Sequence, residues 1–125
     1  MIKEIMRSDI VKLKKEDSLC KALDIMDAHN VNGAPVVDEN GQLIGMIVKA
    51  DIYRFLMEEG HYDTCPVDWA MTKDVVIARS EEDIMIVAKR LRKNNIVAIP
   101  IIDDKSVVKG IVSIEDVMDY MIKKS

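Results

Sequence analysis

The feature that most constrains this chain is an internal repeat with an offset of 65 residues. Residues 6–57 align with residues 71–122 without a gap, and nine of the aligned positions are identical. Repetition at a fixed period is a fold-level signal, so we expect the two halves to share one local structure. We place the first repeat in residues 1–60 and the second in residues 61–125, and expect them to form one compact module.

Each repeat contains the same order of predicted elements. A short β-branched run, at residues 10–11 and 75–77, is followed by apolar residues spaced as on one face of a helix, at 19–26 and 84–91. Asn30 and Asn95 then end these helices, because asparagine tolerates the left-handed conformation that a helix end often requires. Two strands and a closing helix complete each repeat. The order predicts an α+β fold of two β-α-β-β-α repeats.

The hairpins and the closing helices are the clearest of these elements. Asn40-Gly41 lies between two apolar runs, which is a strong signal for an antiparallel hairpin, and the second repeat has a similar turn. The closing helices, around residues 52–57 and 117–122, carry apolar residues on more than one face. A helix of this kind is usually buried on more than one side. We therefore expect self-association, in the form of a homodimer.

Composition excludes several classes of protein. The net charge of −4 and the pI near 5.2 argue against a surface that binds nucleic acid or anionic membranes. Cys20 and Cys65 have no CxxC partner, which indicates neither a metal site nor a disulfide framework. The sequence has no signal peptide and no apolar run of the roughly 20 residues that a membrane span needs. We expect a soluble cytoplasmic protein.

The segment Gly110-Ile111-Val112-Ser113-Ile114-Glu115-Asp116 is the strongest functional candidate. It predicts a strand that runs into the first turn of a helix, where unpaired N–H groups favour an anionic or hydroxyl-rich ligand near Ser113 and Asp116. The same two residues also fit a capping box, which needs no ligand. The near copy in the first repeat, Gly45 to Asp51, favours the ligand-binding interpretation.

The whole pattern resembles a tandem pair of CBS domains. The features that carry the resemblance are Met71-Thr72, Ile99-Pro100-Ile101-Ile102-Asp103 and the Gly110 to Asp116 segment, in this order and spacing. The resemblance implies that the repeats pack about a pseudo-twofold axis, with two clefts between them. It also implies regulatory binding of AMP, ADP, ATP or S-adenosylmethionine. From the residues themselves we expect no catalytic residues, no metal and no other cofactor, because the sequence shows no cluster of metal ligands and no Gly-rich phosphate loop.

The resemblance assigns roles to particular residues. Asp116 and Asp51 are expected to bind ribose hydroxyls, because a carboxylate accepts hydrogen bonds from a diol but is repelled by a phosphate. Ser113 is then left for the phosphate. The expected walls of the adenine slot lie before and at the two prolines and in the first strands. They are Ala34, Pro35, Ile99, Pro100, Ile10 and Val75.

The first repeat departs from this pattern at one position. Val48 replaces Ser113 there and has no hydroxyl to offer a phosphate, although the charge of Lys49 could substitute. We therefore expect the Asp51 cleft to be the weaker one. Two hypotheses remain open: a regulatory module that binds an adenosine ligand and acts on an unidentified effector protein, or a structural dimerisation module with degenerate sites. No arrangement of nucleophile and base indicates an enzyme.

Overall fold

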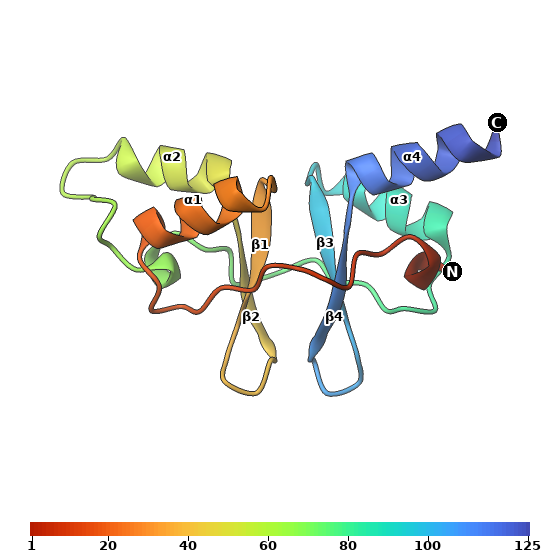
Figure 1. Cartoon of the computed structure of the whole chain (residues 1–125), viewed down its shortest axis with the longest axis horizontal. Coiled ribbons are helices and arrows are strands. Elements are labelled where there is room, and N and C mark those ends of the chain that lie inside the picture. Colours follow the sequence, from red (N-terminus) through yellow and green to blue (C-terminus); the bar gives the residue numbers. More distant parts are fainter. The chain divides into compact units, whose positions relative to one another are not determined.

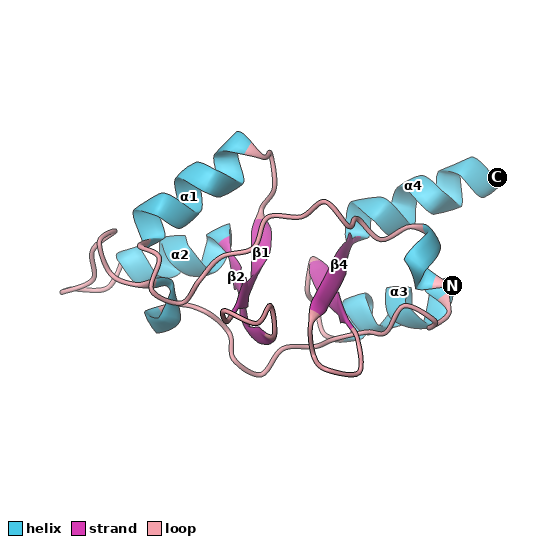
Figure 2. Ribbon diagram, turned by 60° about the horizontal axis from the view of Figure 1, so that its bottom comes forward, coloured by secondary structure: helices cyan, strands magenta, loops and turns pink.

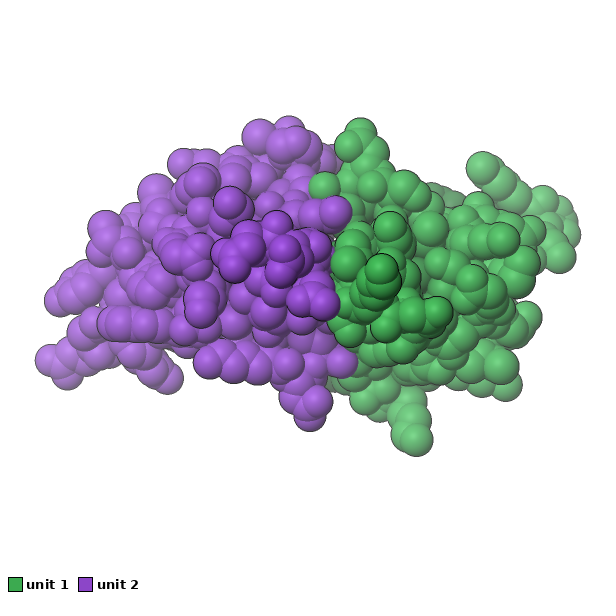
Figure 3. All heavy atoms as spheres, turned by 90° about the horizontal axis from the view of Figure 1, so that it is seen from below, with its two compact units in different colours: residues 1–10, 76–125 green, residues 11–75 purple.

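The computed structural model describes residues 1–125 and divides them into two compact units. Unit 2 consists of residues 11–75, and unit 1 combines residues 1–10 with residues 76–125 (Figure 3). The units therefore do not follow the order of the repeats. The leading segment of each repeat, residues 1–10 in the first and residues 61–75 in the second, belongs to the unit that holds the helices and hairpin of the other repeat. We call these two stretches the crossing segments.

Both units have the same architecture, as Figure 1 shows. In each, a two-stranded antiparallel hairpin has both of its helices on one side. In unit 2 the elements are α1 (Leu19–Ala28), β1 (Gly33–Val37), β2 (Leu43–Val48), α2 (Lys49–Leu56) and the short 3-10 helix η2 (Val67–Trp69). In unit 1 they are η1 (Ile2–Glu4), α3 (Ile84–Lys93), β3 (Ala98–Ile102), β4 (Val108–Ser113) and α4 (Ile114–Lys124). The predicted α+β fold class is confirmed.

The ends of the first helix in each repeat follow the sequence signals. Ser18 caps α1 by accepting a hydrogen bond from the N–H of Lys21, and Asp83 caps α3 in the same way. Asn30 and Asn95 follow the two helices with φ angles of 55° and 53°. The left-handed conformation predicted for these two asparagines is confirmed.

An aspartate organises the turn of each hairpin. One carboxylate oxygen of Asp38 accepts hydrogen bonds from the backbone N–H groups of residues 40 and 42, both at 2.9 Å. Asp103 repeats this arrangement with Lys105 and Val107, at 2.8 and 3.0 Å. The bond from Val107 holds the pKa of Asp103 below its usual value. These bonds explain why aspartate occupies both positions.

The first strand that we predicted in each repeat is shorter than expected. Residues 10–12 and 75–77 form no strand, and the strands that Figure 2 draws in magenta are those of the hairpins. Only Leu13 and Ala78 make single parallel bridges, to Val36 and Ile101. A parallel ladder reaching back toward residue 10 or 75 would need an N–H from the residue before each bridge partner. That residue is Pro35 or Pro100, which has no N–H to donate. The proline therefore stops the ladder after one bridge.

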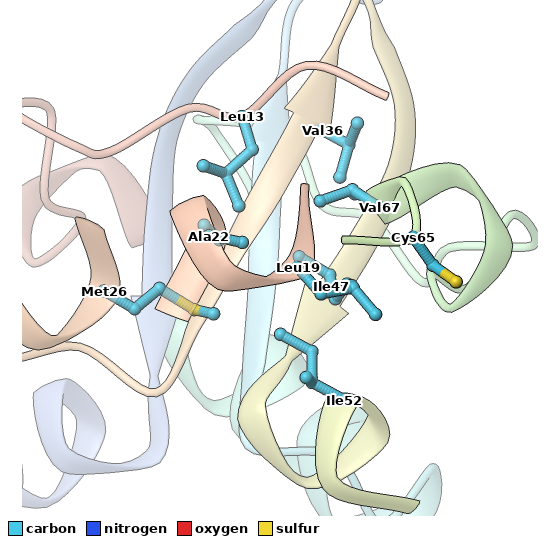
Figure 4. Packing of buried hydrophobic residues seen from close by; sticks show 10 residues of the cluster. Leu13, Leu19, Ala22, Met26, Val36, Ile47, Ile52, Cys65 and Val67 are labelled. Carbon is cyan, nitrogen blue, oxygen red and sulfur yellow. The ribbon is translucent and has the colours of Figure 1, made fainter. Parts of the chain in front are cut away.

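Each unit has its own hydrophobic core, and the two cores are built at equivalent positions. In unit 2, α1 and α2 pack on β1 and β2 through buried side chains (Figure 4). The cluster comprises Leu13, Leu19, Ala22, Met26, Ala34, Val36, Ile47, Ile52, Cys65 and Val67. Every member except Cys65 has its counterpart, 65 residues away, in the cluster of unit 1. The counterparts include Ile2, which corresponds to Val67.

The repeated glycines explain how the leading segments are held. Arg7 and Ile111 exchange two backbone hydrogen bonds, of 2.9 and 3.0 Å, so the leading segment of the first repeat lies along β4. A Cβ atom on Gly110 would lie 2.8 Å from the carbonyl oxygen of Arg7 and 2.9 Å from the sulfur of Met6. Only glycine allows this approach without a shift of the backbone. The crossing segment and the glycine therefore form one packing unit.

Unit 2 repeats this contact with residues from the second repeat. Thr72 and Met46 exchange backbone hydrogen bonds of 2.8 and 2.9 Å. A Cβ atom on Gly45 would lie 2.5 Å from the sulfur of Met71 and 3.0 Å from the carbonyl oxygen of Thr72. The identical pairs Met6 with Met71 and Gly45 with Gly110 thus have a structural reason.

We predict that Gly110→Ala lowers the free energy of unfolding by about 1–3 kcal/mol, because the new methyl group overpacks the backbone of the crossing segment. Gly45→Ala should cost less, since the group nearest to its Cβ is a flexible methionine side chain. Urea denaturation measures both changes. Lys109→Ala, on an exposed position beside Gly110, is the control and should change little. Wild-type stability of Gly110→Ala would show that the crossing segment is not held by this contact.

Candidate functional site

Asp116 and Ser113 form a capping box at the junction of β4 and α4. The N–H of Asp116 donates to Ser113 Oγ at 3.1 Å, and the N–H of Ser113 donates to Asp116 Oδ2 at 2.8 Å. The strand delivers Ser113 in an extended conformation, and the helix begins at the next residue. The capping box that we considered as an alternative is therefore present. It leaves one oxygen of Asp116 to other partners.

Arg7 occupies that remaining oxygen. Its Nε donates to Asp116 Oδ1 at 2.9 Å, and the side chain of Arg7 is 56% exposed while that of Asp116 is only 9% exposed. The crossing segment brings Arg7 to this place, because its backbone is bonded to Ile111 two residues before Ser113. A carboxylate oxygen accepts two hydrogen bonds, so each oxygen of Asp116 retains an acceptor position. A diol could use these positions if the exposed guanidinium of Arg7 moved aside.

Asp51 has a different setting at the equivalent place in unit 2. Val48, the residue before α2, provides no side-chain cap. The carboxylate of Asp51 pairs with Arg54 on the next turn of the same helix, and its side chain is 24% exposed. Asp51 is thus neither part of a capping box nor bound to the crossing segment.

Lys49 is already paired and is therefore not free to replace the missing serine. Its Nζ pairs with Asp27 on α1, and its side chain is only 19% exposed. The ammonium group therefore joins the two helices of unit 2. An anionic ligand would have to compete with Asp27 for it.

A cavity of about 720 Å³ lies against Asp51, entirely within unit 2. This volume falls within the 300–1,000 Å³ range typical of small-molecule sites. Thr72 and Lys73, from the crossing segment, contribute a hydroxyl and an ammonium group to its wall. Arg54, Phe55, His61 and Trp69 also line it. The cavity combines aromatic rings with charges of both signs.

The predicted wall residues fall into two groups. Ile10, Ile99 and Pro100 belong to unit 1 with Asp116, whereas Ala34, Pro35 and Val75 belong to unit 2 with Asp51. Ala34 and Ile99 are fully buried in the two hydrophobic cores, which leaves their backbone and not their side chains for a ligand. Pro35 and Pro100 are buried as well, and Ile10 and Val75 are half-buried.

The sequence reasoning gave no site role to three polar residues of the crossing segments, although Thr72 is part of the Met71-Thr72 feature that carries the resemblance. Arg7 contacts Asp116, and Thr72 and Lys73 share the cavity with Asp51. The identity of Met6 and Met71 marks both segments as a repeated feature. Local sequence does not reveal that each segment lies on the other repeat, so the partners of these residues could not be assigned from it.

Two further findings concern the chain as a whole. No helix of the structure has both the length and the apolar character that crossing a membrane requires. No three or more histidine, cysteine, aspartate or glutamate side chains gather as a metal site would require.

Comparisons with known proteins place the repeats in a family. The family model described as "CBS domain" matches residues 2–58 and again residues 67–123. A curated relative, the L-aspartate semialdehyde sulfurtransferase of Methanocaldococcus jannaschii, is 32% identical over 94% of this chain. Inosine-5′-monophosphate dehydrogenase of Aquifex aeolicus is 35% identical over 86% of it. The matched part is 22% of the length of each of these two relatives.

Solved structures agree with the family model. The CBS domain pair of protein MJ0100, crystallised in complex with 5′-methylthioadenosine and S-adenosyl-L-methionine, superposes with a TM-score of 0.92. The two sequences are 31% identical, and the superposition covers 100% of this chain and 98% of the other.

We predict that Ser113→Ala lowers the free energy of unfolding of the ligand-free protein by about 1 kcal/mol, because it removes the helix cap. Chemical denaturation measures the change. Ser8→Ala, at an exposed residue of the leading segment, is the matched control and should leave stability within about 0.5 kcal/mol. Equal stability of Ser113→Ala and wild type would mean that the capping box contributes nothing.

Proposed function

The chain belongs to the CBS domain family, and on this basis we propose that it is a regulatory module that binds an adenosine-containing ligand. The observation that carries the proposal is the nearly buried carboxylate of Asp116. The backbone N–H of Ser113 holds it at a helix N-terminus, and the long side chain of Arg7 covers it. Such a carboxylate is positioned to accept hydrogen bonds from two adjacent hydroxyls.

The ligands of a solved relative support an adenosine compound. The MJ0100 domain pair, which is similar to this chain over its whole length, was crystallised with 5′-methylthioadenosine and S-adenosyl-L-methionine. Both compounds contain adenosine and lack a phosphate. AMP, ADP and ATP share the adenosine part and add phosphates, for which Ser113 and Arg7 offer a hydroxyl and a guanidinium. The ribose and adenine are therefore the common element of the proposal.

In this proposal Asp116 binds the ribose hydroxyls and Ser113 binds a phosphate where the ligand has one. Arg7 leaves Asp116 when the ribose arrives, and its freed guanidinium can bind an anionic group of the ligand bidentately. Ile10, which is half-buried, forms part of the surface on which the adenine packs. Hydrogen bonds to charged groups contribute about 1.5–3 kcal/mol each, so the side chains of Ser113 and Arg7 would supply much of the selectivity for phosphate.

A second candidate site is favoured by the cavity in unit 2. There Asp51 takes the role of the ribose ligand, the half-buried Val75 that of the adenine surface, and Lys73 that of the cation. Lys49 would contribute only after release from Asp27. The lack of a capping serine makes this the weaker site for a phosphorylated ligand.

The regulatory role implies an effector protein. The curated enzymes that resemble this chain are more than four times longer than the matched part. We propose that this chain contributes no catalysis of its own and passes the binding signal to a partner.

The alternative role, a dimerisation module with degenerate sites, predicts that no adenosine compound stabilises the fold. A ligand at 100 times its dissociation constant would add about 2.7 kcal/mol.

Calorimetric titration with adenosine, AMP, S-adenosylmethionine and 5′-methylthioadenosine tests the site. We expect Asp116→Ala to weaken the binding of each of these ligands at least about tenfold, because all of them contain the ribose diol. Ser113→Val should weaken AMP about tenfold and leave adenosine unchanged. Asp51→Ala should have a smaller effect than Asp116→Ala on AMP.

Glu115→Ala is the control for these titrations, because Glu115 lies beside Asp116 in the first turn of α4 but is exposed. If AMP binds two sites with equal affinity, or if Asp51→Ala weakens AMP binding as much as Asp116→Ala does, then Ser113 acts only as a helix cap. Absence of binding by all four compounds would favour the dimerisation module.

We also propose a homodimer formed through the helices. Tyr53 and Met57 of unit 2, and Met118, Met121 and Ile122 of unit 1, are between 51% and 85% exposed. Burying a large apolar side chain contributes about 1.5–3 kcal/mol, so a few of these residues suffice to hold a contact. We predict a dimer in analytical ultracentrifugation at micromolar concentration. Met121→Glu should shift it toward monomer, while Glu39→Lys, on a hairpin turn, should not. A wild-type monomer would refute the dimer.

A further inference from the structure

A hollow of about 530 Å³ lies beside α3, entirely within unit 1. Four of its lining residues come from α3: Ile86, Lys89, Arg90 and Lys93. Residues three, four and seven positions apart lie on one face of a helix, so these side chains form a continuous stripe along α3. We call these four residues the basic stripe. It has an apolar side chain at one end and an ammonium group at the other.

The basic stripe lies on a different face of α3 from the groove toward α4. That groove is lined on α3 by Met85, Ala88, Leu91 and Arg92, and only Lys89 borders both hollows. No residue of α4, and none of the exposed residues of the homodimer proposed above, lines the hollow beside the basic stripe. A partner bound there would therefore not depend on the pairing of two copies.

The cations of the basic stripe differ in whether they already have a partner. Arg90 donates to both carboxylate oxygens of Glu82, at 2.6 and 3.0 Å, and also to the backbone oxygen of Ile77. This bidentate pair neutralises Arg90 and fixes its guanidinium in the wall. Lys89 and Lys93 are exposed and form no ion pair. The hollow therefore presents two positive charges that nothing within the protein neutralises.

Cations in the last turn of a helix also have a simpler explanation, because they stabilise the negative end of the helix dipole. The equivalent helix of unit 2 shows that the fold does not need them. α1 has no basic residue in its last turn. At the positions of the basic stripe, 65 residues earlier, α1 has Lys21, Asp24, Ile25 and Ala28. The apolar end and the basic end of the stripe are both missing there, so the stripe is a property of unit 1 alone.

The basic stripe is complementary to an acidic segment that also carries an apolar side chain. The side chain of Ile86 is 54% exposed and lies one helical turn from Lys89 and Arg90. A partner could therefore bury an apolar group on Ile86 while its carboxylates approach the two unpaired lysines. The chain as a whole has a net charge of −4, so most of its surface repels an acidic partner. Complementary charges would thus direct such a partner to this stripe.

The surroundings of the stripe favour a protein segment over a nucleic acid. Proteins that bind single-stranded nucleic acids combine cations with exposed aromatic rings on which the bases stack. Tyr120 is the only aromatic residue of unit 1, apart from no Phe, Trp or other Tyr. It is half-buried, and Lys124 Nζ lies 5.3 Å from the centre of its ring. The apolar contact at Ile86 suits an amphipathic peptide instead.

We propose that the hollow beside α3 is a docking site for an acidic amphipathic helix of the effector protein. An apolar side chain of that helix packs on Ile86, and carboxylates one turn apart pair with Lys89 and Lys93. Amphipathic helices bind in grooves by anchors with this spacing. The proposal rests on the regulatory role proposed above, which requires an effector protein.

Selection from a random peptide library tests the proposal without assuming a partner sequence. The library displays peptides of about 16 residues, which allows about four helical turns. It is selected on the ligand-free wild type and depleted on Lys89→Glu with Lys93→Glu. We expect the selected peptides to be acidic and to carry apolar residues. In fluorescence anisotropy they should bind the double variant at least about tenfold more weakly than wild type, because attraction becomes repulsion. Ile86→Asn should also weaken them.

The matched control is Lys12→Glu with Lys15→Glu, which makes the same charge change at two exposed lysines of unit 2. It should leave peptide binding within about twofold, since the Debye length at 0.15 M salt is only about 8 Å. Thermal unfolding verifies the fold of each variant.

Three outcomes would overturn the docking site. They are the enrichment of no peptide, selected peptides without an acidic excess, and equal losses in the two double variants. A single-stranded oligothymidine that binds wild type more tightly than the selected peptides, and loses affinity in Lys89→Glu with Lys93→Glu, would show a nucleic-acid site instead. Because the selection uses ligand-free protein, a failure of all adenosine compounds to bind would refute the ligand proposal without changing these results.

Discussion

The structure depends on the close approach of two backbones at each repeated glycine. Gly45 and Gly110 lie where a Cβ atom would strike the crossing segment, at Thr72 and Arg7 respectively. The crossing segment lies on the strand at this glycine. Its polar residues are therefore held next to the helix that follows the strand. The glycine in the motif is thus a packing requirement. In unit 1 it also brings a cation of the crossing segment, Arg7, to the aspartate Asp116.

The two cores show how one plan accommodates different side chains. Leu13 in unit 2 is replaced by the smaller Ala78 in unit 1, whereas Ala34 is replaced by the larger Ile99. Exchanges of this kind conserve total volume, which cores tolerate better than a change at a single position. Cys65 has no counterpart, and it extends the cluster of unit 2 beyond the repeated set. Nothing in the two cores therefore requires the halves to differ, and the differences that bear on function lie at the surface.

Those surface differences separate the two candidate sites. The same glycine-to-aspartate motif gives a capped carboxylate bound to Arg7 in unit 1, and an uncapped carboxylate paired with Arg54 in unit 2. One substitution, serine to valine, removes the cap, and the partner of the aspartate changes with it. One repeated motif thus gives two candidate sites of unequal chemistry. The charges of the helices are a second difference, since Asp24 and Asp27 on α1 stand 65 residues before Lys89 and Arg92 on α3.

The sequence by itself determined the repeat, the order of the helices and hairpins, and the left-handed asparagines after the first helices, and it offered the capping box as an alternative. Each of these depends on residues close together in the chain or on an offset that can be counted. Only the tertiary structure showed that each leading segment joins the other repeat's unit, that Ala34 and Ile99 are buried in the cores, and that Lys49 is paired with Asp27. It also showed the first strands reduced to single bridges, because the missing N–H of a proline acts on a neighbouring segment. These features depend on contacts between residues far apart in sequence, and local propensity and periodicity carry no information about such partners.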